Sequence, residues 1–291
     1  MLYKWTALAA LLMLLFAVAS CNPLPKKAEQ PKQLVIGLLP DREPEQLMEV
    51  HQPLLAFISA KLAVDYKVVI PANYDDFIDK FEKNKIDLAL FGGVTFIKAS
   101  NKNNAIPLAM RNIDLNFVSY LIVRRDSELT NLRMLKGKSF AFGSSLSTSG
   151  HIMPRFYMKR QGITPEEFFS SVIFSGSHTE TINMVVNREV AAGVLNSQVY
   201  ETMLTSKPAI GKQLMVIRQS PPYPDYVWAI QPNFDEEFNQ KIIDAFLSIT
   251  SETETGKAIL SKQSAEAFYP ASIEDFDELK QALMLIEMKE D

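Results

Sequence analysis

The chain has 291 residues, of which 47% are hydrophobic, and a formal net charge of −4 at pH 7. A mildly acidic chain lacks the basic surface of a nucleic-acid-binding protein, so we predict no nucleic-acid partner. The single cysteine excludes an intrachain disulfide, and the three histidines, at positions 51, 151 and 178, form no spaced ligand pair. We therefore predict no metal site and no cofactor.

The N-terminus resembles the export signal of a bacterial lipoprotein. Lys4 precedes an uncharged run over 5–20 that is too short to cross a bilayer comfortably. Small residues then lead into Cys21, as in the lipobox, whose cysteine sulfur carries a diacylglycerol. The alternative is an ordinary secretory signal followed by a chance cysteine.

We accordingly predict a lipoprotein signal peptide over 1–20, then the lipidated Cys21 and a flexible tether over 21–32, rich in proline and lysine. Acyl chains such as palmitate on Cys21 would anchor the protein to the lipid bilayer. The body would then lie in the cell envelope, in the periplasm or at the extracytoplasmic face. The sequence leaves the inner or outer membrane open.

Along the body, buried-strand patterns alternate with helical patterns, which is typical of α/β sheets. The expected strands are 34–39, 66–70, 86–91, 106–110, 117–123, 139–142, 172–174, 192–195, 214–218 and 226–231. The expected helices are 45–62, 74–85, 94–101 and 179–187, and from Phe234 onward only helical patterns remain, at 234–250, 253–262 and 272–288.

The length of the body favours two lobes rather than one. Two long extended stretches, 116–124 and 214–231, could each carry the chain from one lobe to the other. We therefore predict that 33–115 plus 228–291 form lobe 1 and that 118–225 form lobe 2. A ligand would lie in the cleft between them.

The most informative segment follows the strand predicted over 139–142. Ser147, Thr148 and Ser149 stand where an amphipathic helix begins, and Gly150 follows them. The first backbone N–H groups of a helix lack intrahelical partners and carry partial positive charge, so the three hydroxyls beside them suit an oxyanion. Capping of the helix by a serine-rich loop is the alternative.

Several blocks, in order, resemble the phosphonate/phosphate-binding protein family of ABC transporters. The main block is KGKSFAFGSSLSTSGHIMPR, and further matching segments are IDLALFGGVTFIKA, FSGSH, VLNS, PDYVW, TGKAIL and AFYPA. The resemblance implies a two-lobed, type II periplasmic-binding-protein fold. It also implies a receptor that captures a small phosphorus oxyanion (phosphonate, phosphite or phosphate) for an ABC permease, and not an enzyme.

The resemblance also implies the roles of individual residues. Ser147, Thr148 and Ser149 would hold phosphonate oxygens, and His178 would donate to one of them whether it is neutral or protonated. Asp225 would accept a hydrogen bond from a protonated P–OH group, which would select monoprotonated ligands over sulfate. Capping remains the alternative for His178, and a turn role after Pro224 remains the alternative for Asp225.

Three further residues complete the predicted site. Tyr74 would contribute from lobe 1, unless it is a core or surface tyrosine. Phe117 stands where family members often have tyrosine, so it would keep an apolar wall and lose one polar contact. Gln198 replaces the acidic residue that pairs with the ammonium of amino-substituted phosphonates, which disfavours 2-aminoethylphosphonate.

Two other functions stay open at this point. A lipoprotein with the same closed form could signal to a membrane histidine kinase, and an envelope phosphatase or phosphonate-cleaving enzyme is a third reading. No GxSxG elbow supports the enzyme. We expect a monomer.

Overall fold

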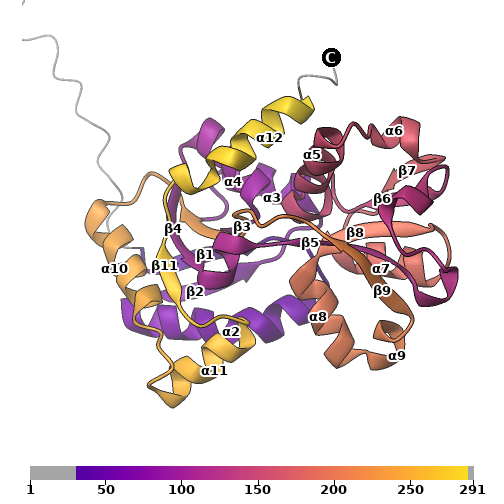
Figure 1. The fold of residues 1–291 in the computed structure, drawn as a ribbon. Helices are drawn as coiled ribbons and strands as arrows, with labels where there is room; N and C mark the ends of the chain where they lie inside the picture. The colour runs from indigo at the N-terminus through magenta and orange to yellow at the C-terminus, as the bar shows by residue number, and fades with distance from the viewer. Residues whose placement is uncertain (1–30, 288–291) are drawn as a thin grey trace, which may run out of the picture.

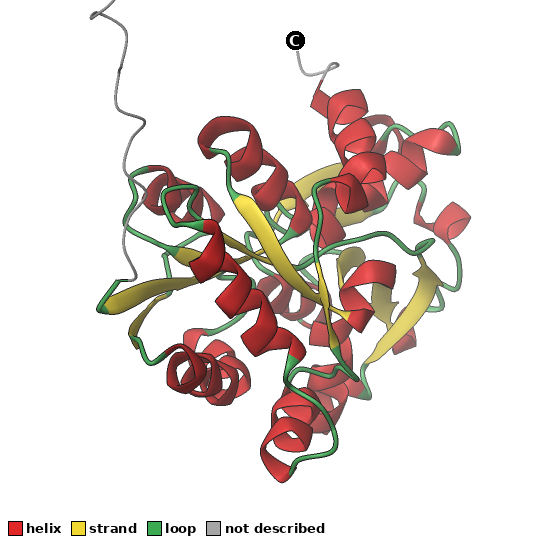
Figure 2. Ribbon diagram, turned by 90° about the vertical axis from the view of Figure 1, so that its left-hand side faces the viewer, coloured by secondary structure: helices red, strands yellow, loops and turns green. Residues whose placement is uncertain are grey.

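The computed structural model describes residues 31–287, so the predicted signal peptide, Cys21 and most of the predicted tether lie outside the described residues. The described chain forms two α/β lobes, one containing its early and late residues and the other its middle (Figure 1). Strands lie inside and helices outside in both lobes (Figure 2). The predicted two-lobed α/β class is confirmed.

A six-stranded mixed sheet forms the first lobe. Its order is β11 (Phe268–Pro270), β4 (Ile106–Arg111), β10 (Val227–Ile230), β3 (Leu88–Phe91), β1 (Gln33–Leu38) and β2 (Asp65–Val69). Strand β1 is parallel to β2 and β3, whereas β10 is antiparallel to β3 and β4. The antiparallel direction of β10 follows from its connection, because this strand returns from the other lobe.

A five-stranded mixed sheet forms the second lobe. Its order is β7 (Ser171–Phe174), β6 (Ser139–Phe142), β8 (Ala192–Asn196), β5 (Ser119–Arg124) and β9 (Leu214–Gln219). Strand β6 is parallel to β7 and β8, and β5, which enters from the first lobe, is antiparallel to β8 and β9. The two sheets therefore share one plan, in which the strand that arrives from the opposite lobe runs against its neighbours.

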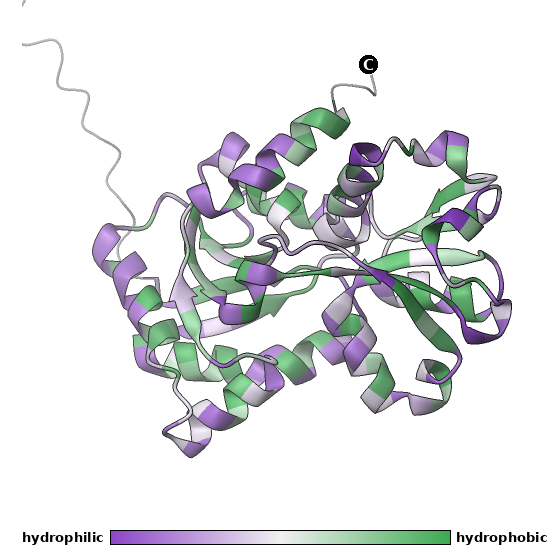
Figure 3. Ribbon diagram, in the orientation of Figure 1, coloured by the Kyte–Doolittle hydropathy of each residue, from purple (hydrophilic) through white to green (hydrophobic). Residues whose placement is uncertain are grey.

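Helices follow most strands, and their buried apolar residues form common cores with the sheets. Hydrophobic and hydrophilic residues alternate along these helices (Figure 3). In the first lobe the helices are α2 (Pro44–Leu62), α3 (Tyr74–Glu82), α4 (Gly93–Asn103), α10 (Glu236–Leu247), α11 (Glu254–Lys262) and α12 (Asp277–Glu287). In the second lobe they are the π-helix η4 (Thr148–Ile152), α5 (Met153–Arg160), α6 (Pro165–Phe168), α7 (His178–Val186), α8 (Ser197–Ser206) and α9 (Pro208–Gly211). Short 3-10 turns are η1 (Asn112–Asn116), η2 (Arg125–Ser127), η3 (Leu132–Leu135) and η5 (Glu274–Phe276).

The prediction of helices alone after Phe234 is wrong at β11. This strand has three residues, and Tyr269 and Pro270 are exposed at the edge of the sheet. Three residues are too few to show a period of two, and pairing with β4 is what makes them a strand.

Two segments connect the lobes and lie side by side. The Phe117 N–H donates to the Tyr223 carbonyl at 2.8 Å, and the Tyr223 N–H donates to the Phe117 carbonyl at 3.0 Å. The limits of the lobes expected from the sequence, 33–115 plus 228–291 and 118–225, remain a proposal.

The C-terminal helix α12 crosses from one lobe to the other (Figure 1). It packs on α4 of the first lobe and on α5 of the second. Leu279 and Leu283 on its inner side are buried, and Ile152 and Met153 from the second lobe belong to the same apolar cluster. The first-lobe core thus extends beneath the helix that begins at Thr148. Within 31–287, no helix combines the length and the apolar character needed to cross a membrane.

Candidate functional site

Four helices begin at one place between the lobes. Tyr74 is the first residue of α3, Gly93 of α4, Thr148 of η4 and His178 of α7. Helix N-termini present N–H groups without intrahelical partners and a partial positive charge. A negatively charged group at this place would therefore meet favourable dipoles from both lobes without any lysine or arginine.

The residues at this place form what we call the buried polar cluster. Its members are Tyr74, Ser147, Thr148, Ser149, His178 and Asp225, and none is more than 3% exposed. The structure thus brings together six of the eight ligand-binding residues predicted from the sequence.

The helix at Thr148 opens with a π turn rather than an α turn. The Ile152 N–H donates to the Ser147 carbonyl at 3.0 Å, and the Met153 N–H donates to the Thr148 carbonyl. Bonds that span five residues leave one more N–H free at the start than an α-helix does. The Ser147 hydroxyl accepts from the Gly150 N–H at 2.9 Å, so the predicted cap is present as well.

Gly150 is needed for this turn because two other groups approach it closely. A Cβ at this position would lie 2.9 Å from the Ser147 Oγ and 3.0 Å from the His178 Cε1. Glycine alone lets the π turn and the imidazole come this close.

His178 is held as a neutral hydrogen-bond donor. Its Nδ1 accepts from the Asn196 N–H at 3.4 Å, which assigns the proton to Nε2. Burial lowers the pKa of His178 to about 4, so the ring carries no charge near pH 7. The Nε2 atom is buried and has no partner among the described residues.

Asp225 is positioned to share a proton. Its Oδ1 accepts from the Gly93 N–H at 3.0 Å, while the buried Oδ2 has no partner in the described structure. Burial raises the pKa of Asp225 to about 7, and the Gly93 N–H and the Thr148 and Ser149 side chains act in the opposite direction. Near neutral pH the carboxyl group can hold a proton or give it up.

Tyr74 supplies the third unsatisfied atom. Its hydroxyl is buried and has no hydrogen-bond partner among the described residues, and burial raises the pKa of Tyr74 well above 10.0. Buried polar atoms without partners are rare in folded proteins. Three of them in one cluster, on Tyr74, His178 and Asp225, mark a place where a polar ligand would complete the hydrogen bonding.

The lobes also contact each other directly here. The Val94 N–H of α4 donates to the Thr148 Oγ1 at 3.0 Å. The Gly93 and Val94 donors are thus engaged with Asp225 and Thr148, and the Thr95 hydroxyl donates to the Gly92 carbonyl at 2.8 Å. The N-terminus of α4 fixes the cluster from the first lobe.

The other two predicted residues lie at its margins. Phe117 is buried on the connecting segments, where its ring meets the Tyr226 ring edge-on with a centroid distance of 5.5 Å. The Gln198 side chain lines a neighbouring cavity with Arg42 and Arg111, and no member of the buried polar cluster lines that cavity. The structure therefore does not bring Gln198 together with the cluster.

Sequence analysis missed three polar residues next to the cluster. The Tyr226 hydroxyl donates to the Asp41 Oδ2 at 2.6 Å, and the Asn196 Nδ2 donates to the Tyr226 hydroxyl at 2.8 Å. The available signal was positional, because Asp41 and Asn196 stand at or just beyond the ends of predicted strands, where parallel sheets present ligand contacts.

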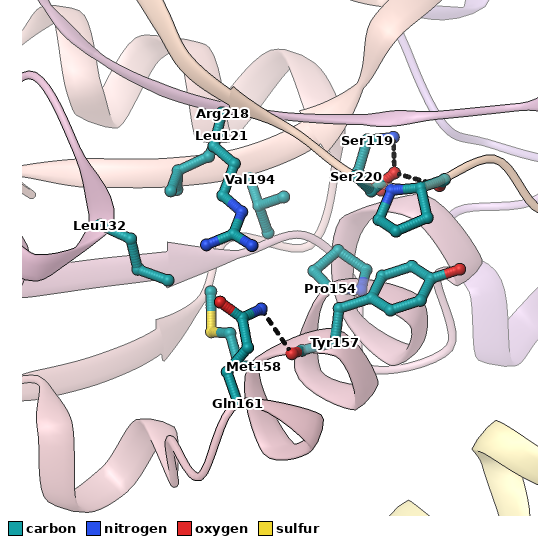
Figure 4. Close-up of a pocket in the computed structure, with 11 residues that line it drawn as sticks. Ser119, Leu121, Leu132, Pro154, Tyr157, Met158, Gln161, Val194, Arg218 and Ser220 are labelled. Carbon is teal, nitrogen blue, oxygen red and sulfur yellow. Dashed lines mark hydrogen bonds between the residues drawn. The ribbon is translucent and has the colours of Figure 1, made fainter.

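A second concavity lies on the second lobe, between α5 and the strands β5, β8 and β9 (Figure 4). Arg218 extends over its apolar floor, and the Gln161 amide donates to the Tyr157 carbonyl at 2.8 Å. No member of the buried polar cluster lines this concavity. Within 31–287, no group of three or more His, Cys, Asp or Glu side chains could hold a metal ion.

Comparison with protein families gives a match over residues 36–276 to the model described as "ABC transporter, phosphonate, periplasmic substrate-binding protein". The chain belongs to this family. Its members are substrate-binding proteins of transporters, which agrees with the resemblance predicted from the blocks around Ser147–Ser149.

Individual relatives agree with the family. The probable ABC transporter phosphite binding protein PhnD1 of Prochlorococcus marinus (strain MIT 9301) is 31% identical over 280 residues, which cover 92% of this chain and 93% of that protein. The phosphonates-binding periplasmic protein of Escherichia coli (strain K12) is 26% identical over 90% of this chain and 79% of its own length. A solved structure of P. marinus PhnD1 in complex with methylphosphonate has a TM-score of 0.83 at 29% identity, covering 89% of this chain and 99% of that one. The predicted two-lobed periplasmic-binding-protein fold is confirmed.

The raised pKa of Asp225 predicts a pH-dependent cost to stability. In the folded state this carboxyl keeps its proton up to about pH 7, whereas an ordinary aspartate has a pKa of 3.8. The protonated carboxyl therefore contributes fully to stability below pH 3.8, and this contribution is lost as the pH rises through 7. Asp225→Asn should raise the unfolding free energy of the ligand-free protein at pH 8 by roughly 2 kcal/mol or more, and have little effect at pH 4. Urea unfolding at the two pH values measures this difference.

Asp126→Asn is the matched control, because Asp126 is a surface aspartate whose pKa is lowered to about 2 by its hydrogen bond to Arg124. It should bring no gain at pH 8. An Asp225→Asn protein that is less stable than the parent at pH 8 would contradict the assignment.

Proposed function

We propose that the protein captures a small phosphorus oxyanion, namely a phosphonate, phosphite or phosphate, between its two lobes and presents it to an ABC permease. The observation that carries this proposal is the buried polar cluster, where helix N-termini from both lobes meet and three buried polar atoms lack partners. Membership of the family and the phosphite- and methylphosphonate-binding relative support it.

In this proposal the ligand oxygens are held by neutral donors. Ser147, Thr148 and Ser149 provide hydroxyl groups and the N–H groups of the π turn, and His178 donates from Nε2. The Tyr74 hydroxyl donates from the first lobe. Hydrogen bonds to a charged acceptor each contribute about 1.5–3 kcal/mol, so several of them can replace a cation.

Asp225 decides which oxyanions are accepted. A carboxylate beside an oxyanion is repulsive unless one proton lies between the two oxygens. That proton can come from the ligand's P–OH group or from Asp225 itself, whose pKa burial raises to about 7. Above pH 7 Asp225 gives up its own proton and sulfate has none to supply, so there the site should favour phosphorus oxyanions over sulfate.

Gln198 supports a ligand without a positive charge. As a neutral amide it supplies no negative charge to pair with an ammonium group, so we favour phosphite, methylphosphonate or phosphate over 2-aminoethylphosphonate. Phe117 provides an apolar wall at the connecting segments.

We propose binding without turnover. The unprotonated nitrogen of His178 faces the Asn196 N–H, so this histidine is not placed to act as a general base towards the ligand. The comparisons do not support the alternative of a sensor that signals to a histidine kinase.

We also propose that the body acts as a lipid-anchored monomer in the periplasm or at the extracytoplasmic face. The support is the pattern of small residues before Cys21 and the proline- and lysine-rich residues after it. Diacylglycerol on Cys21 would keep the receptor close to its permease.

Calorimetric titration of the purified protein with phosphite, methylphosphonate and phosphate tests the ligand proposal. Ser149→Ala should weaken binding about tenfold or more, because it removes a donor to a charged group. Ser145→Ala, in the same loop but exposed, should leave binding unchanged. Equal affinities of the two variants, or no binding of any of the three ligands by the parent, would exclude the proposal.

The shared proton predicts a pH profile for binding. Below pH 7 the affinity should be nearly constant, because one proton is available between Asp225 and the ligand. Above pH 7 both groups lose their protons, and affinity should fall by up to about tenfold per pH unit. An affinity for phosphite that is the same from pH 6 to pH 9 would rule out the shared proton.

Lipid attachment is tested with the full-length chain expressed in bacteria. The parent should incorporate labelled palmitate and sediment with membranes, whereas Cys21→Ser should be unlabelled and soluble. Ser20→Ala keeps a small residue before the cysteine and should behave like the parent. A parent protein without label would overturn the anchor.

A further inference from the structure

Beside the buried polar cluster lies a second set of hydrogen-bonded residues, which we call the Asp41 network: Asp41, Tyr226 and Asn196. They are 1%, 4% and 0% exposed. Asp41 follows β1 of the first lobe, Asn196 ends β8 of the second lobe, and Tyr226 lies on the segment that connects the lobes. The network therefore crosses the space between the lobes from one side to the other.

The bonds in this network have fixed directions. The Asn196 Oδ1 accepts from the backbone N–H groups of Gln198 at 2.7 Å and Val199 at 3.1 Å, so the Asn196 Nδ2 must be the group that donates to Tyr226. The Tyr226 hydroxyl then donates to Asp41. The donor and acceptor of each hydrogen bond are thus fixed by the preceding bond, so no single side chain can reorient without breaking a bond.

Asp41 is held by hydrogen bonds from several groups. Burial alone would raise the pKa of its carboxyl group, yet the pKa is lowered because the Arg42 guanidinium lies beside it and both Arg42 and Tyr226 donate hydrogen bonds to it. The Arg42 Nε donates to the Asp41 Oδ1 at 3.1 Å, and the His178 N–H donates to the Asp41 carbonyl oxygen at 3.3 Å. Asp41 thus remains ionised and tied to both lobes.

The Asp41 network lies between the buried polar cluster and a separate cavity. The buried polar cluster lies on one side, and the Asp41 carboxylate interacts electrostatically with its members Tyr74 and His178. On the other side is an outer cavity, whose lining includes Asp41, Tyr226, Gln198 and Thr202. Asp41 and Tyr226 therefore line the outer cavity and also lie close to the cluster.

The outer cavity has cations, but they already have partners. Arg111 is paired with Asp114 at 2.6 Å, and Lys262 is paired with Glu49 at 2.7 Å. The outer cavity is thus electrostatically balanced, whereas the buried polar cluster has unsatisfied atoms on three residues. This difference favours the charged end of a ligand in the buried polar cluster, with the Asp41 network next to it.

We propose that the Asp41 network is a specificity element that limits the size of the substituent on phosphorus. In this proposal the network accepts a small substituent such as hydrogen, hydroxyl or methyl beside it, whereas a longer chain would have to displace a buried, ionised and hydrogen-bonded carboxylate. This inference rests on the proposed function. It also assigns discrimination by size to Asp41 rather than to Gln198, which lines the outer cavity.

Calorimetry with methyl-, ethyl- and propylphosphonate at one pH tests the proposal, because these ligands differ in length and not in charge. The parent protein should bind propylphosphonate at least about tenfold more weakly than methylphosphonate, since the longer chain breaks charged hydrogen bonds. The double variant Asp41→Ala/Arg42→Ala removes one charge of each sign and leaves no unpaired buried charge. It should bring the two affinities within about threefold of each other.

Two further variants control for folding and position. Thr202→Ala changes the outer cavity without touching the Asp41 network, so it should keep the parent ratio of affinities. Tyr226→Phe removes only the hydroxyl that joins Asp41 to Asn196, and should relax the ratio by about threefold even if the double variant does not fold. General destabilisation of the protein would weaken the binding of all three ligands alike and would not change the ratio of their affinities.

Parent protein that binds propylphosphonate as tightly as methylphosphonate would overturn the inference. The inference would also be overturned if Tyr226→Phe and the double variant kept the parent's ratio of methylphosphonate to propylphosphonate affinity. If the parent binds none of the phosphonates, phosphite or phosphate, the proposed function itself fails and this inference fails with it.

Discussion

The central physical constraint is that the buried polar cluster has no cation with which to balance an anion. No lysine or arginine belongs to the buried polar cluster, and the nearby guanidinium of Arg42 is bonded to Asp41. The available positive potential comes from helix N-termini, a neutral imidazole and hydroxyl groups. Such donors favour an anion of defined geometry, because each must point at a particular oxygen.

This arrangement makes the buried polar cluster depend on contact between the two lobes. Tyr74 and Gly93 come from the first lobe and Thr148 and His178 from the second, so the cluster exists only when the lobes meet. Helix α12 packs on α4 and α5 together and thereby supports two of the converging N-termini. In the proposals made above, selectivity arises at two separate points, from the proton at Asp225 and from the Asp41 network.

Much of the fold could be predicted because its elements are long and regularly patterned. The alternation of strands and helices gave the α/β class, and the two extended stretches around Phe117 and Tyr223 indicated two lobes. Strand β11 was missed because three residues carry no readable period. The π turn was missed because the serines and Gly150 are compatible with an α-helix as well, and only the packing of His178 against Gly150 distinguishes the two.

The sequence by itself determined the chemical groups of the site, since Ser147–Ser149, His178 and Asp225 stand in recognisable blocks at predicted helix starts and connections. Tertiary structure alone decided their states. It buried Asp225 so that its pKa rises, and set the tautomer of His178 through Asn196. It also joined Asp41 to Tyr226, which is 185 positions away in the chain. Protonation, tautomer and long-range contact depend on which groups surround a residue in space, and local sequence patterns carry no record of that surrounding.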